Sequence, residues 1–296
     1  MRDMAAVNPT TNLRGIVSML AAVGSFALMD AGLKRLAADY SPMQVTFLRA
    51  VASLPFLLIA AGWSRQWGDL VMRRPMLHLM RGVLGVIMLS TFVYAVSELS
   101  LANTYAVYLC APLLVTALSV PLLGDQVTTR RWIAIAVGLC GALIVLQPGG
   151  DGFVSLAGLA ALLSMVCYSA SGITIRILGR TDSNRSMVFW FLLFLALGSG
   201  LFAWRDWSPV AMGDVMVLAF IGFSGALGQH FITDAFRRAP PSVVAPFEYT
   251  ALLWAFGLDW VFWQILPTGA VLAGGALVIA TGLYIIADER RTPAPG

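Results

Sequence analysis

The segment Met187–Trp204, with the sequence MVFWFLLFLALGSGLFAW, carries no charged side chain along its whole length. A helix of this length spans about 27 Å, close to the ~30 Å of hydrocarbon in a bilayer. Nine further apolar runs lie near residues 14–33, 42–62, 77–97, 101–123, 131–147, 153–177, 214–236, 241–264 and 267–287. The sequence therefore predicts ten transmembrane helices joined by short loops.

The composition agrees with a membrane protein. Of the 296 residues, 59% are apolar and 11% are charged, and the mean hydropathy is +0.82. An ordinary globular chain carries about 25% charged residues, so most of this surface must face lipid rather than water. The pI near 9.2 does not indicate nucleic-acid binding, because the basic residues are scattered in short loops.

No constellation for catalysis or metal binding is visible in the sequence. Cys110, Cys140 and Cys167 lie inside apolar runs without metal-ligand spacing, and the histidines His78 and His230 stand far apart. No phosphate-binding loop and no loop long enough for an ATP-binding domain is present. We therefore expect no enzyme, no metal, no cofactor and no ATP-driven pump, while a channel remains an alternative.

The basic residues predict the orientation. With ten spans both termini share one side, and fourteen arginines fall on that side against three basic residues, Lys34, Arg35 and Arg205, on the other. Basic residues are retained on the cytoplasmic side. The tails 1–13 and 288–296 are thus predicted to be cytoplasmic, in a multi-pass protein of the inner membrane.

A weak repeat relates the two halves of the chain. Gly82-x-x-Gly85 recurs as Gly222-x-x-Gly225 at an offset of 140 residues. Small residues at this spacing let helices approach closely, and packing is the main role expected of these glycines.

A similar offset, 142 residues, relates Lys34 to Arg176. The two halves, 14–147 and 153–287, would each hold five helices, and an odd number forces the second copy to insert upside down. The predicted fold class is therefore an all-α membrane protein with ten transmembrane helices, arranged as two inverted five-helix repeats around a central cavity.

Several short segments carry a family resemblance. They are Leu122–Gln126 at the end of the fourth span, Met29–Lys34, Phe47–Arg49, Arg74–Gly82 and Ala245–Tyr249. With the five-plus-five pattern, the chain resembles the EamA family of the drug/metabolite transporter superfamily, and the last four segments are similar to a branch that includes S-adenosylmethionine carriers. The resemblance implies a bundle that carries amino acids, their derivatives or other small metabolites, often outward.

Charged residues inside spans are the first candidates for a site. Such a residue costs at least ~2.5 kcal/mol to insert and usually faces the bundle interior. In the outer half, Asp30 and Arg49 lie on consecutive helices and are expected to form an ion pair. The pair would act as a structural clamp, or Arg49 would hold a substrate carboxylate and Asp30 would take up a coupling proton.

The inner half holds a second group of candidates. Arg81, His230 and Glu248 are predicted to lie at similar depth, and Asp234 shares a face with His230. Glu248 follows Pro246, which suits a helix end that lines a cavity. Glu248 would bind a substrate amino or onium group or a proton, or it would pair with Arg81 structurally. Asp234 is expected at the water interface, and His230 either serves the site or is an ordinary interior histidine.

Aromatic residues form a second set of candidates for a flat or cationic substrate. We expect Tyr105, Tyr108, Trp190 and Tyr249 at the cavity, whereas most tryptophans belong to the interfacial belt. Glu98 and Asp259, near the outer face, are predicted to be solvated.

Acidic and basic groups together indicate a zwitterionic substrate. The predicted function is a secondary transporter of a small organic metabolite, such as an amino acid or a derivative, by alternating access and in the direction of export. Protons are the candidate coupling ion, and the protein would work in the lipid bilayer as a monomer or an antiparallel homodimer. The alternative is an uptake carrier for an S-adenosylmethionine-like or cofactor-like molecule.

Overall fold

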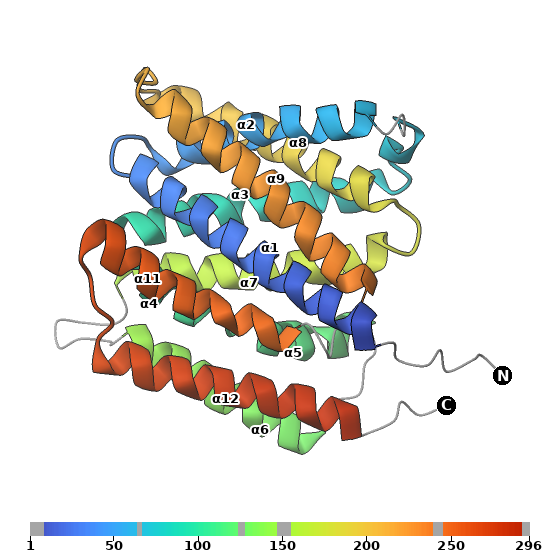
Figure 1. The fold of residues 1–296 in the computed structure, drawn as a ribbon, viewed down its shortest axis with the longest axis vertical. Coiled ribbons are helices and arrows are strands. Elements are labelled where there is room, and N and C mark those ends of the chain that lie inside the picture. The colour runs from blue at the N-terminus through green and yellow to red at the C-terminus, as the bar shows by residue number, and fades with distance from the viewer. Residues whose placement is uncertain (1–8, 64–66, 124–127, 147–154, 239–244, 292–296) are drawn as a thin grey trace.

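A computed structural model of the chain describes residues 9–63, 67–123, 128–146, 155–238 and 245–291 (Figure 1). Within these ranges every regular element is a helix. The longer helices are α1 (Pro9–Leu36), α2 (Pro42–Trp63), α3 (Pro75–Glu98), α6 (Thr129–Leu146), α7 (Leu156–Leu178), α8 (Asn184–Ala203), α9 (Asp214–Arg238) and α12 (Gly269–Arg291). The shorter elements are η1 (Trp67–Leu70), α4 (Leu101–Tyr108), α5 (Ala111–Leu123), η2 (Trp204–Asp206), η3 (Ala245–Thr250) and α11 (Ala251–Trp263).

Length and apolarity make this a multi-pass membrane protein. Among the described residues, six helices are long and apolar enough to cross a bilayer, namely α1, α2, α3, α7, α8 and α9. Shorter apolar helices lie within 101–115, 132–145 and 269–285. Large apolar side chains such as Trp63 and Met216 are 90% and 77% exposed, which suits a surface that faces lipid.

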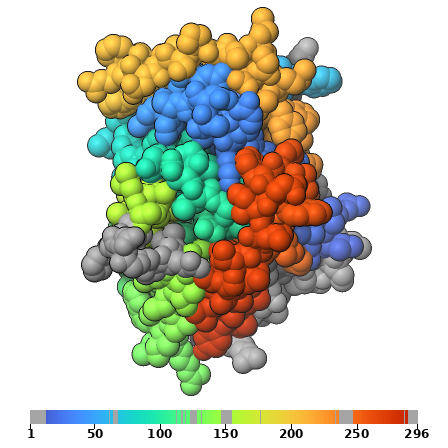
Figure 2. All heavy atoms as spheres, turned by 90° about the vertical axis from the view of Figure 1, so that its left-hand side faces the viewer, coloured from blue at the N-terminus to red at the C-terminus, as the bar shows by residue number. Residues whose placement is uncertain are grey.

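The helices lie side by side in one bundle, and neighbours in space are mostly distant in sequence (Figure 1). The most extensive contacts join α1 to α9, α3 to α7, α6 to α12 and α2 to α8. The pair α6 and α12, green and red, forms one end of the molecule in the space-filling view (Figure 2). Each of these pairs joins a helix that precedes residue 147 to one that follows residue 155.

The predicted span 101–123 proves to be two helices. A turn at Leu109 and Cys110 separates α4 from α5, and the Cys110 N–H bonds three residues back to the Val107 carbonyl. The physical reason is Pro112, which has no N–H to donate to the carbonyl of Tyr108. Helical bonding resumes when Leu114 donates to the Cys110 carbonyl.

The predicted span 241–264 is also irregular. Its described part begins with the 3-10 helix η3, which contains Pro246, and continues as α11. Residues 241–244 lie outside the described residues. The break around Pro267 is confirmed: α11 ends at Trp263 and α12 begins at Gly269.

Glycines let several helix pairs approach closely. A Cβ atom on Gly222 of α9 would overlap the carbonyl oxygen of Ala52 in α2. A Cβ atom on Gly141 of α6 would lie 2.9 Å from the carbonyl oxygen of Gly274 in α12, and the relation is reciprocal. Gly82 and its neighbours in the sequence motifs likewise face side chains of adjacent helices, as expected for small residues in membrane bundles.

Gly222→Ala should destabilise the bundle, because the obstacle is backbone rather than a flexible side chain. We expect a loss of about 1–3 kcal/mol, typical of overpacking, measured as a lower unfolding temperature of the protein purified in detergent. Gly257→Ala in α11 is the matched control, because a Cβ there meets nothing within 4 Å. Equal stability of the two variants would contradict the close approach of α2 and α9.

Candidate functional site

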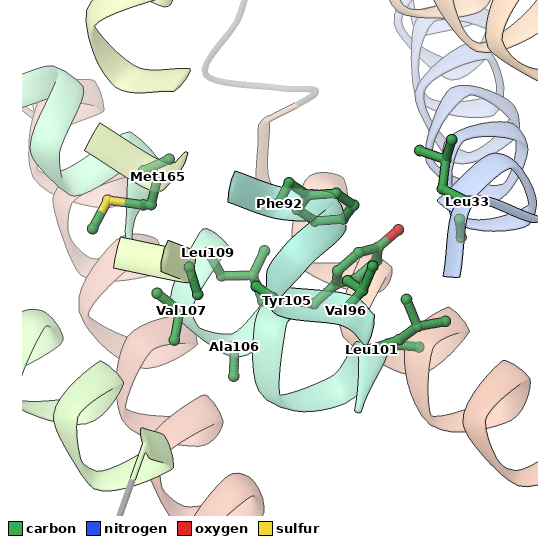
Figure 3. Close-up of a cluster of buried hydrophobic side chains, with 14 of the residues drawn as sticks. Leu33, Phe92, Val96, Leu101, Tyr105, Ala106, Val107, Leu109 and Met165 are labelled. Atoms are coloured by element: carbon green, nitrogen blue, oxygen red, sulfur yellow. The ribbon is translucent and has the colours of Figure 1, made fainter. Parts of the chain in front are cut away.

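Asp30, in the C-terminal third of α1, is held by a tyrosine from α4. The Tyr105 hydroxyl donates to Asp30 Oδ2 at 2.6 Å. Tyr105 is buried, whereas Asp30 is half-buried. Figure 3 shows Tyr105 beside Phe92 and Val96, with its hydroxyl directed toward the side of α1. Two residues predicted separately as site candidates are therefore direct partners.

Arg49, on α2, is incompletely paired. Its Nε lies 3.3 Å from the Met29 sulfur, a weak acceptor, and its Nη1 is buried without a hydrogen-bond partner in the described part of the chain. The ion pair expected with Asp30 is not formed: no such contact within 4.0 Å occurs among the described residues, although the two charges lie within electrostatic range.

The reason lies in the packing of α9. Gly225 of α9 faces both the Met29 sulfur of α1 and the Ser53 hydroxyl of α2. The consecutive helices α1 and α2 each pack extensively against α9, a helix from the second half of the chain, and only sparsely against each other. The short loop between them does not make them packing partners.

Tyr108 links three helices through polar contacts. Its hydroxyl lies 2.8 Å from Ser164 Oγ of α7, and Ser164 donates to the Met88 carbonyl of α3 at 2.6 Å. Since Ser164 has one proton, Tyr108 is the donor to Ser164. The Tyr108 ring packs against Phe92 and Tyr168, each with a centroid separation of 5.3 Å.

Glu248 lies in η3, and no hydrogen bond or ion pair reaches its carboxylate from the described residues. It is half-buried and lies within electrostatic range of the Tyr168 and Tyr249 hydroxyls. Tyr249 is buried against Gly282, and its hydroxyl also has no partner there. The alternative pair with Arg81 is not formed.

These contacts, with the electrostatic proximity of Arg49 to Asp30 and of Glu248 to Tyr168, define what we call the central polar cluster. Its members are Asp30, Arg49, Tyr105, Tyr108, Tyr168 and Glu248. The cluster draws on α1, α2 and α4 from the first half and on α7 and η3 from the second. Tyr168 is 41% exposed although it packs against Tyr108, so its ring borders open space. The cluster contains one guanidinium and two carboxylates.

Two grooves lie outside this cluster. One, of about 560 Å³, runs between α1 and α11 and is lined by Leu20, Thr250, Leu253, Trp254, Gly257, Leu258 and Val261. The other, of about 410 Å³, lies beside Arg14 and Asp234. Neither is the predicted central cavity.

Three other sequence candidates lie elsewhere. Arg81 is 5% exposed, donates to the Met187 carbonyl and stacks 4.5 Å over the Phe191 ring, so its described partners belong to α8. The Trp190 indole donates to the Leu70 carbonyl beside η1.

His230 is exposed on α9, and the prediction that it faces the interior is wrong. Gly228 packs on Phe26 of α1, and a residue two positions further is rotated by about 200° from that contact. Asp234, four residues on, is half-buried and accepts a hydrogen bond from Ser18 of α1 at 2.8 Å.

Asp259 was expected to be solvated, and this prediction is also wrong. Its residue is 1% exposed, and its carboxylate lies 3.3 Å from Lys34 Nζ. Glu98 is exposed, as predicted. The sequence around Asp259 does not reveal its partner, because Lys34 lies 225 residues away along the chain.

Loops tie the two halves together outside the spans. Asp182, between α7 and α8, accepts from the Arg73 N–H at 2.9 Å and from the Thr181 hydroxyl at 2.6 Å, and lies 3.0 Å from His78 Nε2. Burial raises the pKa of Asp182, but the hydrogen bonds from Thr181, Arg73 and His78 outweigh it, so the pKa lies below its usual value. On another loop, Tyr40 donates to Asp214 at 2.6 Å.

A bundle of apolar helices with incompletely paired charged side chains is compatible with a membrane transporter. Among the described residues no group of three or more His, Cys, Asp or Glu side chains is placed to hold a metal ion. The EamA-like transporter family matches residues 13–147 and 155–287, and the chain belongs to this family. Because the family and the named relatives are transporters, the protein carries small molecules and is not an enzyme.

The named relatives differ in their substrates. The chain is 29% identical to the pseudopaline exporter CntI of Pseudomonas aeruginosa, over 90% of this chain and 93% of the exporter. It is 28% identical to a riboflavin transporter of Rhizobium johnstonii, over 98% of both chains. It is 24% identical to an S-adenosylmethionine uptake transporter of Rickettsia conorii, over 95% of both.

A solved structure shares the fold. It matches with a TM-score of 0.63 at 20% identity, over 95% of this chain and 98% of that one.

Asp182→Asn should lower the unfolding temperature at pH 7. A pKa held below its usual value means that the ionised carboxylate stabilises the folded chain at neutral pH, and this stabilisation is lost as the pH falls through the acidic range below about 4. The difference between variant and parent, measured by thermal unfolding in detergent, should therefore shrink in acid. Asp206→Asn, an exposed carboxylate of η2, is the control and should change little at any pH. A gap independent of pH would contradict the role of the charge.

Proposed function

We propose that the protein is an alternating-access secondary transporter of a small zwitterionic metabolite, and that the central polar cluster is its substrate site. Ten spans would form two inverted repeats, 14–147 and 153–287. The protein would lie in the inner membrane, with both tails, 1–13 and 288–296, in the cytoplasm. The direction favoured is export, with protons as the candidate coupling ion.

The unpaired charges of the cluster carry this proposal. A buried guanidinium nitrogen without a partner is costly, and so is a carboxylate without one in a bilayer. Arg49 and Glu248 therefore suit a ligand that brings a carboxylate to one and an amino or onium group to the other. Asp30, already held by Tyr105, is the candidate for proton uptake or for a second cationic contact.

Water or ligand must reach these groups, and their exposure supports a shared hollow. Asp30, Arg49, Tyr108 and Glu248 are half-buried, and Tyr168 is more exposed still, although all lie among several helices. Polar groups at bilayer depth are tolerated where they line a water-filled space.

The pairing of helices supports the inverted repeat. If α1 corresponds to α7 and α3 to α9, the contact of α1 with α9 has its counterpart in that of α7 with α3. The pairs α2 with α8 and α6 with α12 map onto themselves. Both irregular elements, α4–α5 and η3–α11, also take corresponding places.

The proposed cytoplasmic location of both tails is supported by topology, and the proposed direction of export is supported by one relative. The first turn of α1 and the last turn of α12 lie on the same side of the bundle (Figure 1), as an even number of spans requires. The retained arginines favour the cytoplasm for that side. The relative named as a pseudopaline exporter favours outward transport of an amino-acid-derived compound.

A second candidate is uptake of an S-adenosylmethionine-like or cofactor-like molecule. The Tyr108, Tyr168 and Phe92 rings pack together beside Glu248 and would suit a flat or sulfonium-bearing ligand. Two named relatives take up S-adenosylmethionine or transport riboflavin.

Counterflow in proteoliposomes distinguishes these functions. Vesicles loaded with unlabelled amino acids, S-adenosylmethionine or riboflavin should accumulate the matching labelled compound, because a carrier exchanges substrate across the membrane. Amino-acid exchange would favour the first candidate, and exchange of S-adenosylmethionine or riboflavin the second. Single-channel currents without counterflow would overturn the carrier mechanism.

Glu248→Gln should abolish or strongly reduce counterflow while the protein still folds. Losing a charge-assisted contact weakens binding by about ten- to a hundredfold. Glu98→Gln, at the exposed end of α3, is the matched control and should transport at the parental rate. Unchanged flux in Glu248→Gln would remove this carboxylate from the site.

A further inference from the structure

Asp259 of α11 is the centre of a buried polar network. Its Oδ1 accepts from Lys34 Nζ at 3.3 Å and from the Leu101 N–H at 3.1 Å, and its Oδ2 accepts from the Ala102 N–H at 2.8 Å. The Asp259 carboxylate thus meets the first turn of α4 and the last turn of α1. A carboxylate at a helix N-terminus is favoured by the helix dipole as well as by the free N–H groups.

Lys34 completes the network from the other side. Its residue is 8% exposed, its ammonium donates to the Leu99 carbonyl at 3.0 Å, and it lies 4.6 Å over the Trp263 ring. The ammonium therefore has a carboxylate, a carbonyl and an aromatic face as partners. The contacts of Asp259 and Trp263 join the first half of the chain to α11 of the second, and the bond from Lys34 to Leu99 lies within the first half.

The network lies directly next to the central polar cluster. Asp30 precedes Lys34 by four residues on α1, and Tyr105 follows Leu101 by four on α4, so each pair shares a helix face. Asp30 and Tyr105 are themselves hydrogen-bonded. The network is thus one helical turn beyond the cluster, toward the side of the bundle opposite to the first turn of α1.

The first half of the chain has no carboxylate at the positions that match Asp259. At the offsets of 140–142 residues that relate the halves, the positions matching Asp259 are Ser119, Leu118 and Ala117. The sequence therefore provides this carboxylate in one copy only. Two halves with otherwise corresponding contacts differ at this point.

We propose that Lys34 and Asp259, with the Leu101 and Ala102 amides, form a latch that closes the hollow on the side opposite to the termini. Substrate leaves or enters on that side only when the latch opens and water replaces its contacts. Because the matching positions of the other half carry no carboxylate, we expect the latch to bias the unloaded carrier toward closure on that side. This proposal rests on the proposed function, since it assigns the regulation of the same site.

Opening can be measured without any substrate. In a background with Cys110, Cys140 and Cys167 replaced by Ala, Tyr105→Cys places a thiol beneath the latch. A membrane-impermeant maleimide, applied to the side opposite to the termini, should label this thiol slowly in the parent. With Lys34→Met the labelling rate should rise about tenfold or more, because an unpaired carboxylate at this depth favours hydration.

Arg35→Met is the matched control. Arg35 is the next residue on α1 and pairs with Asp39, but both side chains are about half exposed. Its labelling rate should equal that of the parent. Asp259→Asn, which keeps the shape of the side chain, is the second variant in case Lys34→Met folds poorly. Labelling that stays slow in both variants would overturn the latch.

A reversible cross-link tests whether opening is needed for transport. Lys34→Cys combined with Asp259→Cys, joined by a short bis-methanethiosulfonate, should lose counterflow of labelled amino acids, S-adenosylmethionine and riboflavin and regain it on reduction. The Arg35→Cys and Asp39→Cys pair, which joins the last turn of α1 to the turn directly after it, should keep counterflow when it is cross-linked in the same way. Undiminished counterflow in the cross-linked latch would overturn the proposal. Labelling needs no substrate, so a chain that labels as expected but exchanges none of these probes would retain the latch and lose the proposed function.

Discussion

The structure depends on one constraint: a charge inside an apolar bundle must be held by the protein or by water that the protein admits. Arg81 meets it in part, through the Met187 carbonyl and the Phe191 ring, although its Nε has no hydrogen-bond partner among the described residues. Lys34 and Asp259 meet it through each other and nearby backbone. Arg49 and Glu248 do not meet it from the described side chains alone. Arg81, Lys34 and Asp259 therefore stabilise contacts between helices. At Arg49 and Glu248, solvent or a ligand has to supply the missing hydrogen bonds.

The positions of the six described helices that are long and apolar enough to cross a bilayer followed from run length, because a bilayer admits few alternatives to a helix of sufficient length. Met187–Trp204 lies largely within α8, which extends from Asn184 to Ala203. Run length did not reveal the turn before Pro112, since apolarity continues across it while backbone bonding does not. Local bonding rules, rather than hydropathy, decide such interruptions.

The sequence predicted how deep in the bilayer each candidate residue lies, but not which side of its helix the side chain occupies. Asp30 and Tyr105 were both candidates, yet their contact needs α1 and α4 to be neighbours, which no local pattern states. His230 has suitable depth but points away, because α9 turns Gly228 toward Phe26. Rotation about a helix axis is fixed by the neighbouring helix, and a neighbour distant in sequence is visible only in the fold. Asp259 was misjudged for the same reason.

A carrier built from two related halves faces a further requirement. Identical halves would give two closures of equal free energy, and the ratio of the two states would then be set by the membrane and the ligand alone. A single buried contact that is present in one closure and lacks a counterpart in the other shifts that ratio without altering the substrate site. In the proposed alternating-access cycle, the carboxylate of Asp259, whose matching positions in the other half are Ala117, Leu118 or Ser119, is a difference of this kind. A ligand shifts the equilibrium between the two closed states only by the difference in its affinity for them. The contacts that distinguish the two states therefore set how large this difference in affinity must be for transport.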